Sequence, residues 1–252
     1  MSPPSPDPRA HWWKVFVLIF AVSIAVVGYL GRKTYEYAPP IADFVTESGE
    51  VVFSGRDIQR GQEVFLRYGL MDYGSFLGDG GLRGPDFTAE ALNKTAAWMH
   101  RYHDAKSVPE GVEAGTRDHV VRAIVQAELK RNRYDARFYD TRRRHTADSG
   151  APGAIVLSPA QVEACRFLRT YYAQKFGDGG DLAGVEVFTP RHYITDPASL
   201  DQLTAFFFWG AWLSAAERPG FTYSYTHNWP YDPLAGNLPH GGLVFWSVVG
   251  VL

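Results

Sequence analysis

The sequence predicts a mainly α membrane protein, with an N-terminal transmembrane helix, a helical domain that carries a small β-hairpin insertion, and the start of a second transmembrane helix. Three observations predict this fold class. Residues 12–30 (WWKVFVLIFAVSIAVVGYL) form a long apolar run. Between residues 40 and 240, several segments repeat apolar side chains at the three- and four-residue spacing of a helix. Residues 241–252 (GGLVFWSVVGVL) are apolar again.

The first apolar run has the features of an uncleaved membrane anchor. No charged residue lies between Val15 and Leu30, and with Trp12 and Trp13 the run approaches the roughly 20 residues that span a bilayer. Tryptophan at one end and Tyr29 at the other match the aromatic belts of membrane interfaces. A cleaved signal peptide is the alternative, but the run exceeds the roughly 7–15 apolar residues of such a peptide, and no clear Ala-x-Ala site follows.

These observations divide the chain into four parts. We expect a cytoplasmic tail at residues 1–11, a transmembrane helix at 12–31, an extracytoplasmic domain at 32–240 and the beginning of a second transmembrane helix at 241–252. Twelve apolar residues are too few to cross a bilayer, so we expect the sequence to be truncated within that second helix. A short hydrophobic tail or a buried terminal strand is the alternative. Basic residues flank the first helix equally on both sides and do not decide its orientation.

Composition excludes several classes of function. The formal net charge is −2, and the chain has no Lys/Arg-rich tract with interleaved aromatic residues, so nothing indicates a nucleic-acid partner. Cys165 is the only cysteine, which rules out an intrachain disulfide and any Cys-x-x-Cys site for zinc or heme. Its helical surroundings (AQVEACRFLRTYYAQKF) predict a buried thiol, because a nucleophile would need an activating neighbour.

Three helices are expected in the first half of the domain. The second of them begins near Thr88, which is a suitable N-terminal cap, and the third covers residues 118–131 (DHVVRAIVQAELKR). Helical spacing predicts which side chains face the core. In chain order these are Ile58, Gly61, Gln62 and Phe65; Leu92, Ala96 and Met99; and Val121, Ile124, Val125 and Leu129.

The second half of the domain begins with a predicted β-hairpin. Residues 133–157 hold two short β-like runs around a polar, glycine-containing stretch, which predicts a loose hairpin with Arg142–Arg144 at its solvated tip. A fourth helix opens at Ser158–Gln161, where a capping box is combined with proline at the first helical position. It is expected to end near Gly177.

The fifth helix is strongly apolar. It opens at Asp196-Pro197 and is expected to stop at Arg218-Pro219-Gly220. Its apolar stretch, Leu203–Leu213, is too short to span a bilayer, so we expect a buried core helix. Residues 221–239 (FTYSYTHNWPYDPLAGNLP) are then expected to form an ordered loop at the membrane interface.

Residues 61–87 (GQEVFLRYGLMDYGSFLGDGGLRGPDF) resemble the opening of a class I cytochrome c, with a helix, a loop and a Gly-Pro-Asp-Phe turn. In such a protein the loop carries Cys-x-x-Cys-His and attaches the heme, but residues 71–75 here read Met-Asp-Tyr-Gly-Ser. No late methionine is present as a sixth ligand, since the methionines are Met1, Met71 and Met99. The sequence therefore predicts a cytochrome c-like helical domain without heme, in which the last helix crosses the first.

No other motif indicates a site. Five glycines between Gly74 and Gly84 match neither phosphate-binding fingerprint, and we expect them to supply positive φ angles and to let backbone fill the volume of the missing heme. His100 and His103 could face one metal, but without an acidic or cysteine partner nearby they are expected to be a surface pair. A nucleophile elbow and a Ser-His-Asp arrangement are absent. We therefore assign no catalytic, cofactor-binding or metal-ligating residue.

The whole chain resembles the N-terminal part of the quinol-dependent nitric oxide reductase family. The most specific blocks are MDYGS…GPDFTAE and RPGFTYSYTHNWPYDP, in residues 71–90 and 218–233. The resemblance implies an extracytoplasmic cytochrome c-like domain without heme, fused to a catalytic membrane part that is similar to heme–copper oxidases. Family members often have Gly-His-Gly where this chain has Gly78-Asp79-Gly80, so any function of that histidine is absent here.

The resemblance also implies a reaction and a location. Two NO and two quinol electrons give N2O and water at a high-spin heme b (heme b3) paired with a non-heme iron, with a second heme b nearby. Their ligands are implied to lie in membrane helices beyond Leu252. The implied partners are the rest of the catalytic membrane part, the lipid bilayer and quinol, in the inner membrane with the domain on the periplasmic side. We expect this polypeptide alone to be inactive; the alternative is a non-catalytic, membrane-anchored binding or sensing module.

Overall fold

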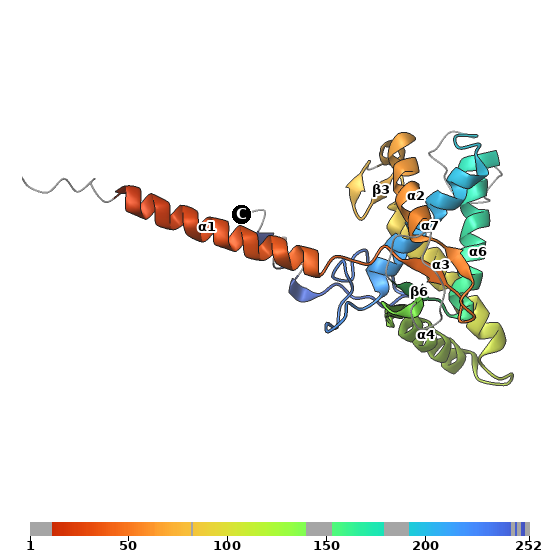
Figure 1. Cartoon of the computed structure of the whole chain (residues 1–252). Coiled ribbons are helices and arrows are strands. Elements are labelled where there is room, and N and C mark those ends of the chain that lie inside the picture. The colour runs from red at the N-terminus through yellow and green to blue at the C-terminus, as the bar shows by residue number, and fades with distance from the viewer. Residues whose placement is uncertain are drawn as a thin grey trace, which may run out of the picture. The chain divides into compact units, whose positions relative to one another are not determined.

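The computed structural model describes residues 12–81, 83–139, 153–178 and 192–242, and residues 245, 248 and 249. The chain divides into two units, Met1–Pro39 (unit 1) and Pro40–Leu252 (unit 2), and Figure 1 labels their main elements. The mainly α fold class predicted from sequence is confirmed, and the β structure is limited to short strands.

Unit 1 is dominated by one long helix, α1 (Trp12–Glu36). None of its residues is buried against protein, and its mean hydropathy reaches 2.2 in the most apolar window. At 1.5 Å per residue it is about 37 Å long, which exceeds the roughly 30 Å of a hydrocarbon core. Helix α1 is the one helix in the described part of the chain with the length and composition to cross a membrane. It continues past the expected end at residue 31 to Glu36, whose carboxylate pairs with Arg32 and Lys33.

Unit 2 contains five α-helices among its described residues. They are α2 (Gly55–Arg67), α3 (Phe87–Lys106), α4 (Ala114–Lys130), α6 (Pro159–Tyr172) and α7 (Pro197–Ala215). Two shorter helical turns are η2 (Leu70–Asp72), which is 3₁₀, and η3 (Ala173–Asp178), which is π-helical. The strands are β1 (Asp43–Val45), β2 (Val51–Phe53), β3 (Ser75–Phe76), β4 (Asp79–Gly80), β5 (Tyr134–Asp135) and β6 (Ala154–Val156).

Helix α7 forms the centre of unit 2. From Leu203 to Ala215 every residue except Trp209 is buried, so the predicted core helix is confirmed. Helices α2, α3 and α6 all pack against it (Figure 1). A helix that is apolar on all sides is stable in water only when other elements surround it. The expected crossing of the first and last helices of the domain is therefore present.

The α2–α7 crossing depends on Gly61. A Cβ atom placed on Gly61 would lie 2.0 Å from the carbonyl oxygen of Gln202 and 2.7 Å from the Cβ of Phe206. No side chain larger than hydrogen fits there without moving one backbone away from the other. The glycine thus sets how closely the two helices approach.

Gly61→Ala is expected to lower the free energy of unfolding by about 1–3 kcal/mol, because overpacking separates α2 from α7. Gly115→Ala in α4 is the matched control, since a Cβ there meets nothing within 4 Å. That exchange should be neutral or stabilising by up to about 1 kcal/mol. Urea unfolding of the full chain in detergent measures both variants. Equal effects of the two substitutions would show that the close approach is unimportant.

A small sheet flanks the helices, in the order β2-β1-β6-β5. The antiparallel β5–β6 pair, with Tyr134 opposite Ile155, confirms the predicted hairpin, although its expected tip at Arg142–Arg144 lies outside the described residues. Strand β6 also pairs in parallel with β1, with Phe44 opposite Ile155. That pairing joins residues about 110 positions apart and has no local signal in the sequence.

Helix boundaries follow local capping chemistry in most cases. The capping box at Ser158 and the cap at Asp196 are both present as predicted. The cap of α3 is Asp86 and not Thr88, which lies buried inside the helix. On α2 the predicted core residue Gln62 is exposed and Val64 is buried in its place. On α4, Val121, Val125 and Leu129 are buried as predicted, whereas Ile124 is only half-buried.

Candidate functional site

The candidate site is the region that would hold heme in a cytochrome c, and it starts with the loop between α2 and α3. The carboxylate of Asp86 fixes this loop. Its Oδ2 accepts hydrogen bonds from Ser75 Oγ (2.8 Å) and Gly78 N (2.6 Å), and its Oδ1 accepts one from Ala89 N (2.9 Å). One side chain therefore caps α3 and holds the β3–β4 hairpin at the same time.

Glycines of the loop supply positive φ angles, as expected from the sequence, and allow a close approach of two backbone segments. Gly78 and Gly80 have φ angles of 83° and 139°, which are unfavourable for residues with a Cβ. At Gly84 a Cβ atom would lie 1.7 Å from the carbonyl oxygen of Tyr73. The backbone therefore packs too tightly here for side chains.

Aromatic rings fill the interior beside this loop. The ring of Phe76 stacks on that of Phe206 with centroids 4.2 Å apart, and the ring of Phe87 stacks on that of Phe207 at 4.9 Å. Side chains, and not backbone alone, thus occupy the space. We call this group the aromatic cluster; its members are Phe65, Phe76, Phe87, Tyr172, Phe176, Phe206 and Phe207.

These residues do not fit a c-type heme. The only thiol, Cys165, is fully buried on α6, and residues 71–75, which the resemblance assigns to the heme-attachment motif, read Met-Asp-Tyr-Gly-Ser. Met99, the other methionine of unit 2, is fully buried on α3. Unit 2 therefore lacks the two thiols that covalent heme attachment requires.

A buried ion pair borders the aromatic cluster. The ammonium group of Lys175 lies 2.6 and 2.8 Å from the two carboxylate oxygens of Glu90, and Tyr171 OH donates to the same carboxylate at 2.7 Å. The side chains of Lys175 and Glu90 are 3% and 10% exposed. Burial lowers the pKa of Lys175, and the charge of Glu90 opposes that shift. Nothing in the sequence predicts this pair, because its members are 85 residues apart.

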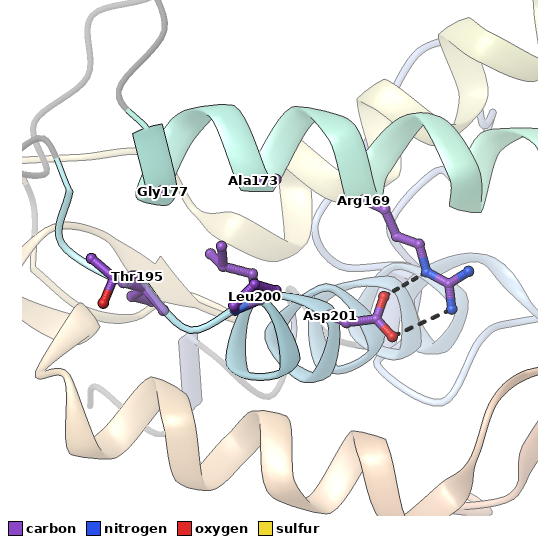
Figure 2. Close-up of a pocket in the computed structure, with 8 residues that line it drawn as sticks. Arg169, Ala173, Gly177, Thr195, Leu200 and Asp201 are labelled. Carbon is purple, nitrogen blue, oxygen red and sulfur yellow. Dashed lines mark hydrogen bonds and ion pairs between the residues drawn. The ribbon is translucent and has the colours of Figure 1, made fainter.

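The surface pocket in Figure 2 lies between α6, η3 and the start of α7 and has a volume of about 320 Å³. Its charged side chains point toward one another: Arg169 Nε lies 2.6 Å from Asp201 Oδ1. Arg169 Nη2 also donates to the carbonyl oxygen of Val52 at 2.6 Å. Burial raises the pKa of Asp201, and Arg169 opposes the shift. The two charges neutralise each other, so both charged side chains of the pocket are paired. Its lining residues are Arg169, Ala173, Gly177, Ile194, Thr195, Pro197, Leu200 and Asp201.

His100 and His103 on α3 are hydrogen-bonded to different partners and do not face a common site. His100 Nε2 lies 3.0 Å from Asp118 Oδ1, whereas His103 Nδ1 is hydrogen-bonded to Ser107 Oγ at 2.7 Å. His103 is buried, so the predicted surface pair is wrong for that residue. Within the described residues no three His, Cys, Asp or Glu side chains are grouped to hold a metal.

Cys165 is the buried thiol that the sequence predicts. It is fully buried within the core, and that burial raises its pKa strongly. A thiol that stays protonated is a poor nucleophile.

The candidate site is thus an interior filled by aromatic rings beneath a cytochrome c-like loop, with one buried cysteine in place of the two thiols that attach a c-type heme. The family model for the cytochrome c-like domain of the nitric oxide reductase NorB matches residues 41–231, about three quarters of the chain. The chain belongs to the nitric oxide reductase NorB family. The resemblance predicted from the MDYGS…GPDFTAE and NWPYDP blocks is thereby confirmed. No individual curated protein matches the chain.

The region that matches the NorB domain coincides with the packed core of unit 2. It begins next to β1, includes α2 to α7 and ends at Tyr231 in the loop that follows α7. Helix α1 lies outside the match, but its length and composition, together with the family, indicate a membrane-associated protein. The aromatic cluster therefore lies within the domain that the family describes as cytochrome c-like.

Proposed function

We propose that the chain is the extracytoplasmic cap of a quinol-dependent nitric oxide reductase, which converts two NO to N2O with electrons from quinol. One observation carries the proposal. The cytochrome c-like domain of this NorB relative has a single cysteine, buried on α6, and an aromatic cluster in its interior. A domain built in this way cannot pass electrons through a c-type heme of its own, and this supports quinol in the membrane as the electron donor.

The proposed topology places the domain on the periplasmic side of the inner membrane. Residues 1–11 are the cytoplasmic tail, 12–31 cross the bilayer, 32–240 form the cap and 241–252 begin a second membrane helix. In this arrangement the heme and iron ligands belong to further membrane helices of the same polypeptide. The role of the cap is to cover that membrane part with a rigid, heme-free domain.

The test uses the native polypeptide, purified from its own membrane. We expect an intact mass well above 28.1 kDa, a b-type but no c-type absorption spectrum, and NO consumption with a reduced quinol as donor. Reduced cytochrome c should not replace the quinol, because unit 2 offers no heme to receive its electrons.

The opposite results are equally informative. A mass near 28.1 kDa without NO consumption would identify a non-catalytic anchored module and withdraw the reductase assignment. A c-type spectrum, or turnover with reduced cytochrome c alone, would contradict the heme-free cap.

A further inference from the structure

The loop at residues 221–239 has almost no charge of its own. Its only Asp, Glu, Lys or Arg is Asp232, which is 5% exposed. Burial and the nearby Arg218 and His240 lower the pKa of His227, so this ring is neutral at neutral pH. Three large side chains are exposed instead. They are Trp229 (46%), Tyr231 (43%) and Leu238 (67%).

Hydrogen bonds within the loop and to α3 and α7 fix its conformation. Asp232 accepts hydrogen bonds from Leu234 N (2.8 Å) and Ala235 N (3.0 Å), and from the side chain of Asn93 on α3 (2.8 Å). Asn237 Nδ2 donates to the carbonyl oxygen of Ser214 on α7 at 2.9 Å. The apolar side chains are therefore presented in a fixed arrangement and do not belong to a loose segment.

The loop also lies at the end of unit 2 where the chain enters and leaves it. The indole N–H of Trp209, in the second half of α7, donates to the carbonyl oxygen of Pro40 at 3.0 Å, which fixes the first residue of unit 2 there. The loop follows the C-terminal end of α7 and leads directly into residues 241–252. Both connections of the domain to its apolar segments thus leave from the same end.

We propose that the exposed side chains of Trp229, Tyr231 and Leu238 lie in the phospholipid headgroup layer of the membrane. Tryptophan and tyrosine favour that layer because they combine an apolar ring with one polar group. The loop adds no exposed charge of its own that would need desolvation, and the charges beside Leu238 come from Lys130 and Glu217, which line a pocket with it. The inference rests on the proposed membrane insertion of residues 241–252, but not on the redox activity.

The single buried cysteine makes the test clean, because an introduced cysteine is the only accessible thiol. The full chain carrying Leu238→Cys is labelled with a nitroxide and reconstituted in phosphatidylcholine vesicles. Electron paramagnetic resonance then compares relaxation by oxygen, which concentrates in lipid, with relaxation by a water-soluble nickel chelate. Leu66→Cys on α2 is the matched control in water, since Leu66 is 58% exposed. Val17→Cys on α1 is the control in lipid.

We expect the oxygen-to-nickel ratio at position 238 to lie several-fold above that at 66 and to approach that at 17. A ratio equal to that at 66 would put the surface in water and overturn the proposal. Shielding from both reagents would overturn it too, because the surface would then pack on protein. A label at Val248→Cys separates this inference from the proposed topology. Lipid exposure at 248 with water exposure at 238 would contradict only the headgroup position of the loop. Water exposure at both positions would also contradict the membrane insertion of residues 241–252.

Discussion

Lys175→Met is expected to lower the free energy of unfolding by about 3–5 kcal/mol, because it leaves a buried carboxylate without a counter-ion. Glu90 is 10% exposed, and its counter-ion within the described part of the chain is Lys175, at 2.6 Å. Tyr171 OH would remain as a neutral donor, which stabilises a carboxylate less than an ammonium does. Urea unfolding of the full chain in detergent, followed by near-ultraviolet circular dichroism, measures the loss.

Two further variants show whether the buried charge is the cause. Arg166→Met breaks the Arg166–Glu163 pair, whose side chains are 63% and 40% exposed, and should cost at most about 1 kcal/mol. The double variant Glu90→Gln with Lys175→Met should regain most of the loss, because it removes the uncompensated charge. If Lys175→Met cost no more than Arg166→Met, the ion pair would not contribute to the stability of the core.

Phe207→Ala is expected to cost about 3–5 kcal/mol, because it opens a cavity in the centre of the aromatic cluster. Phe207 is fully buried, and its ring centroid lies 4.9 Å from that of Phe87 and 5.0 Å from that of Tyr172. Its neighbours come from α3 and α6, so they cannot close the gap without moving two helices. The midpoint of thermal unfolding of the full chain should fall by roughly 6–20 °C, at about 2–4 °C per kcal/mol for a protein of this size.

The control is a large-to-small exchange outside the core. Leu66→Ala on α2 removes a side chain that is 58% exposed and should change stability by no more than about 0.5 kcal/mol. Phe207→Leu keeps most of the volume and should cost clearly less than Phe207→Ala. A loss below about 1 kcal/mol for Phe207→Ala would mean that the aromatic cluster is loosely packed, in conflict with the rigid cap that we propose.

Sequence reasoning was most successful where structure depends on neighbouring residues. The helix starts at Ser158 and Asp196 were predicted because a cap forms between residues two or three positions apart. The all-round apolar pattern of Leu203–Leu213 predicted a core helix for a similar reason, since such a segment must be surrounded. The family was evident from short contiguous blocks.

Sequence reasoning failed where two neighbouring residues are both suitable for one structural role, or where a residue contacts a partner far away in the sequence. Asp86 and Thr88 are both suitable caps, and the choice follows from the bonds of Asp86 to Ser75 and Gly78. Helical spacing alone placed His103 on the surface. In the structure, however, Ser107 and α4 cover its ring. The parallel β1–β6 pairing has no local signature at all.

The sequence by itself determined that this NorB domain cannot attach a c-type heme through two thioether bonds, because it has one cysteine. It also determined an apolar helix at the N-terminus, since membrane helices depend on composition over consecutive residues. Only the tertiary structure decided what fills the interior and which charges meet there. Seven aromatic rings from six elements, and a Lys175–Glu90 pair 85 residues apart, come together through packing that local patterns do not encode.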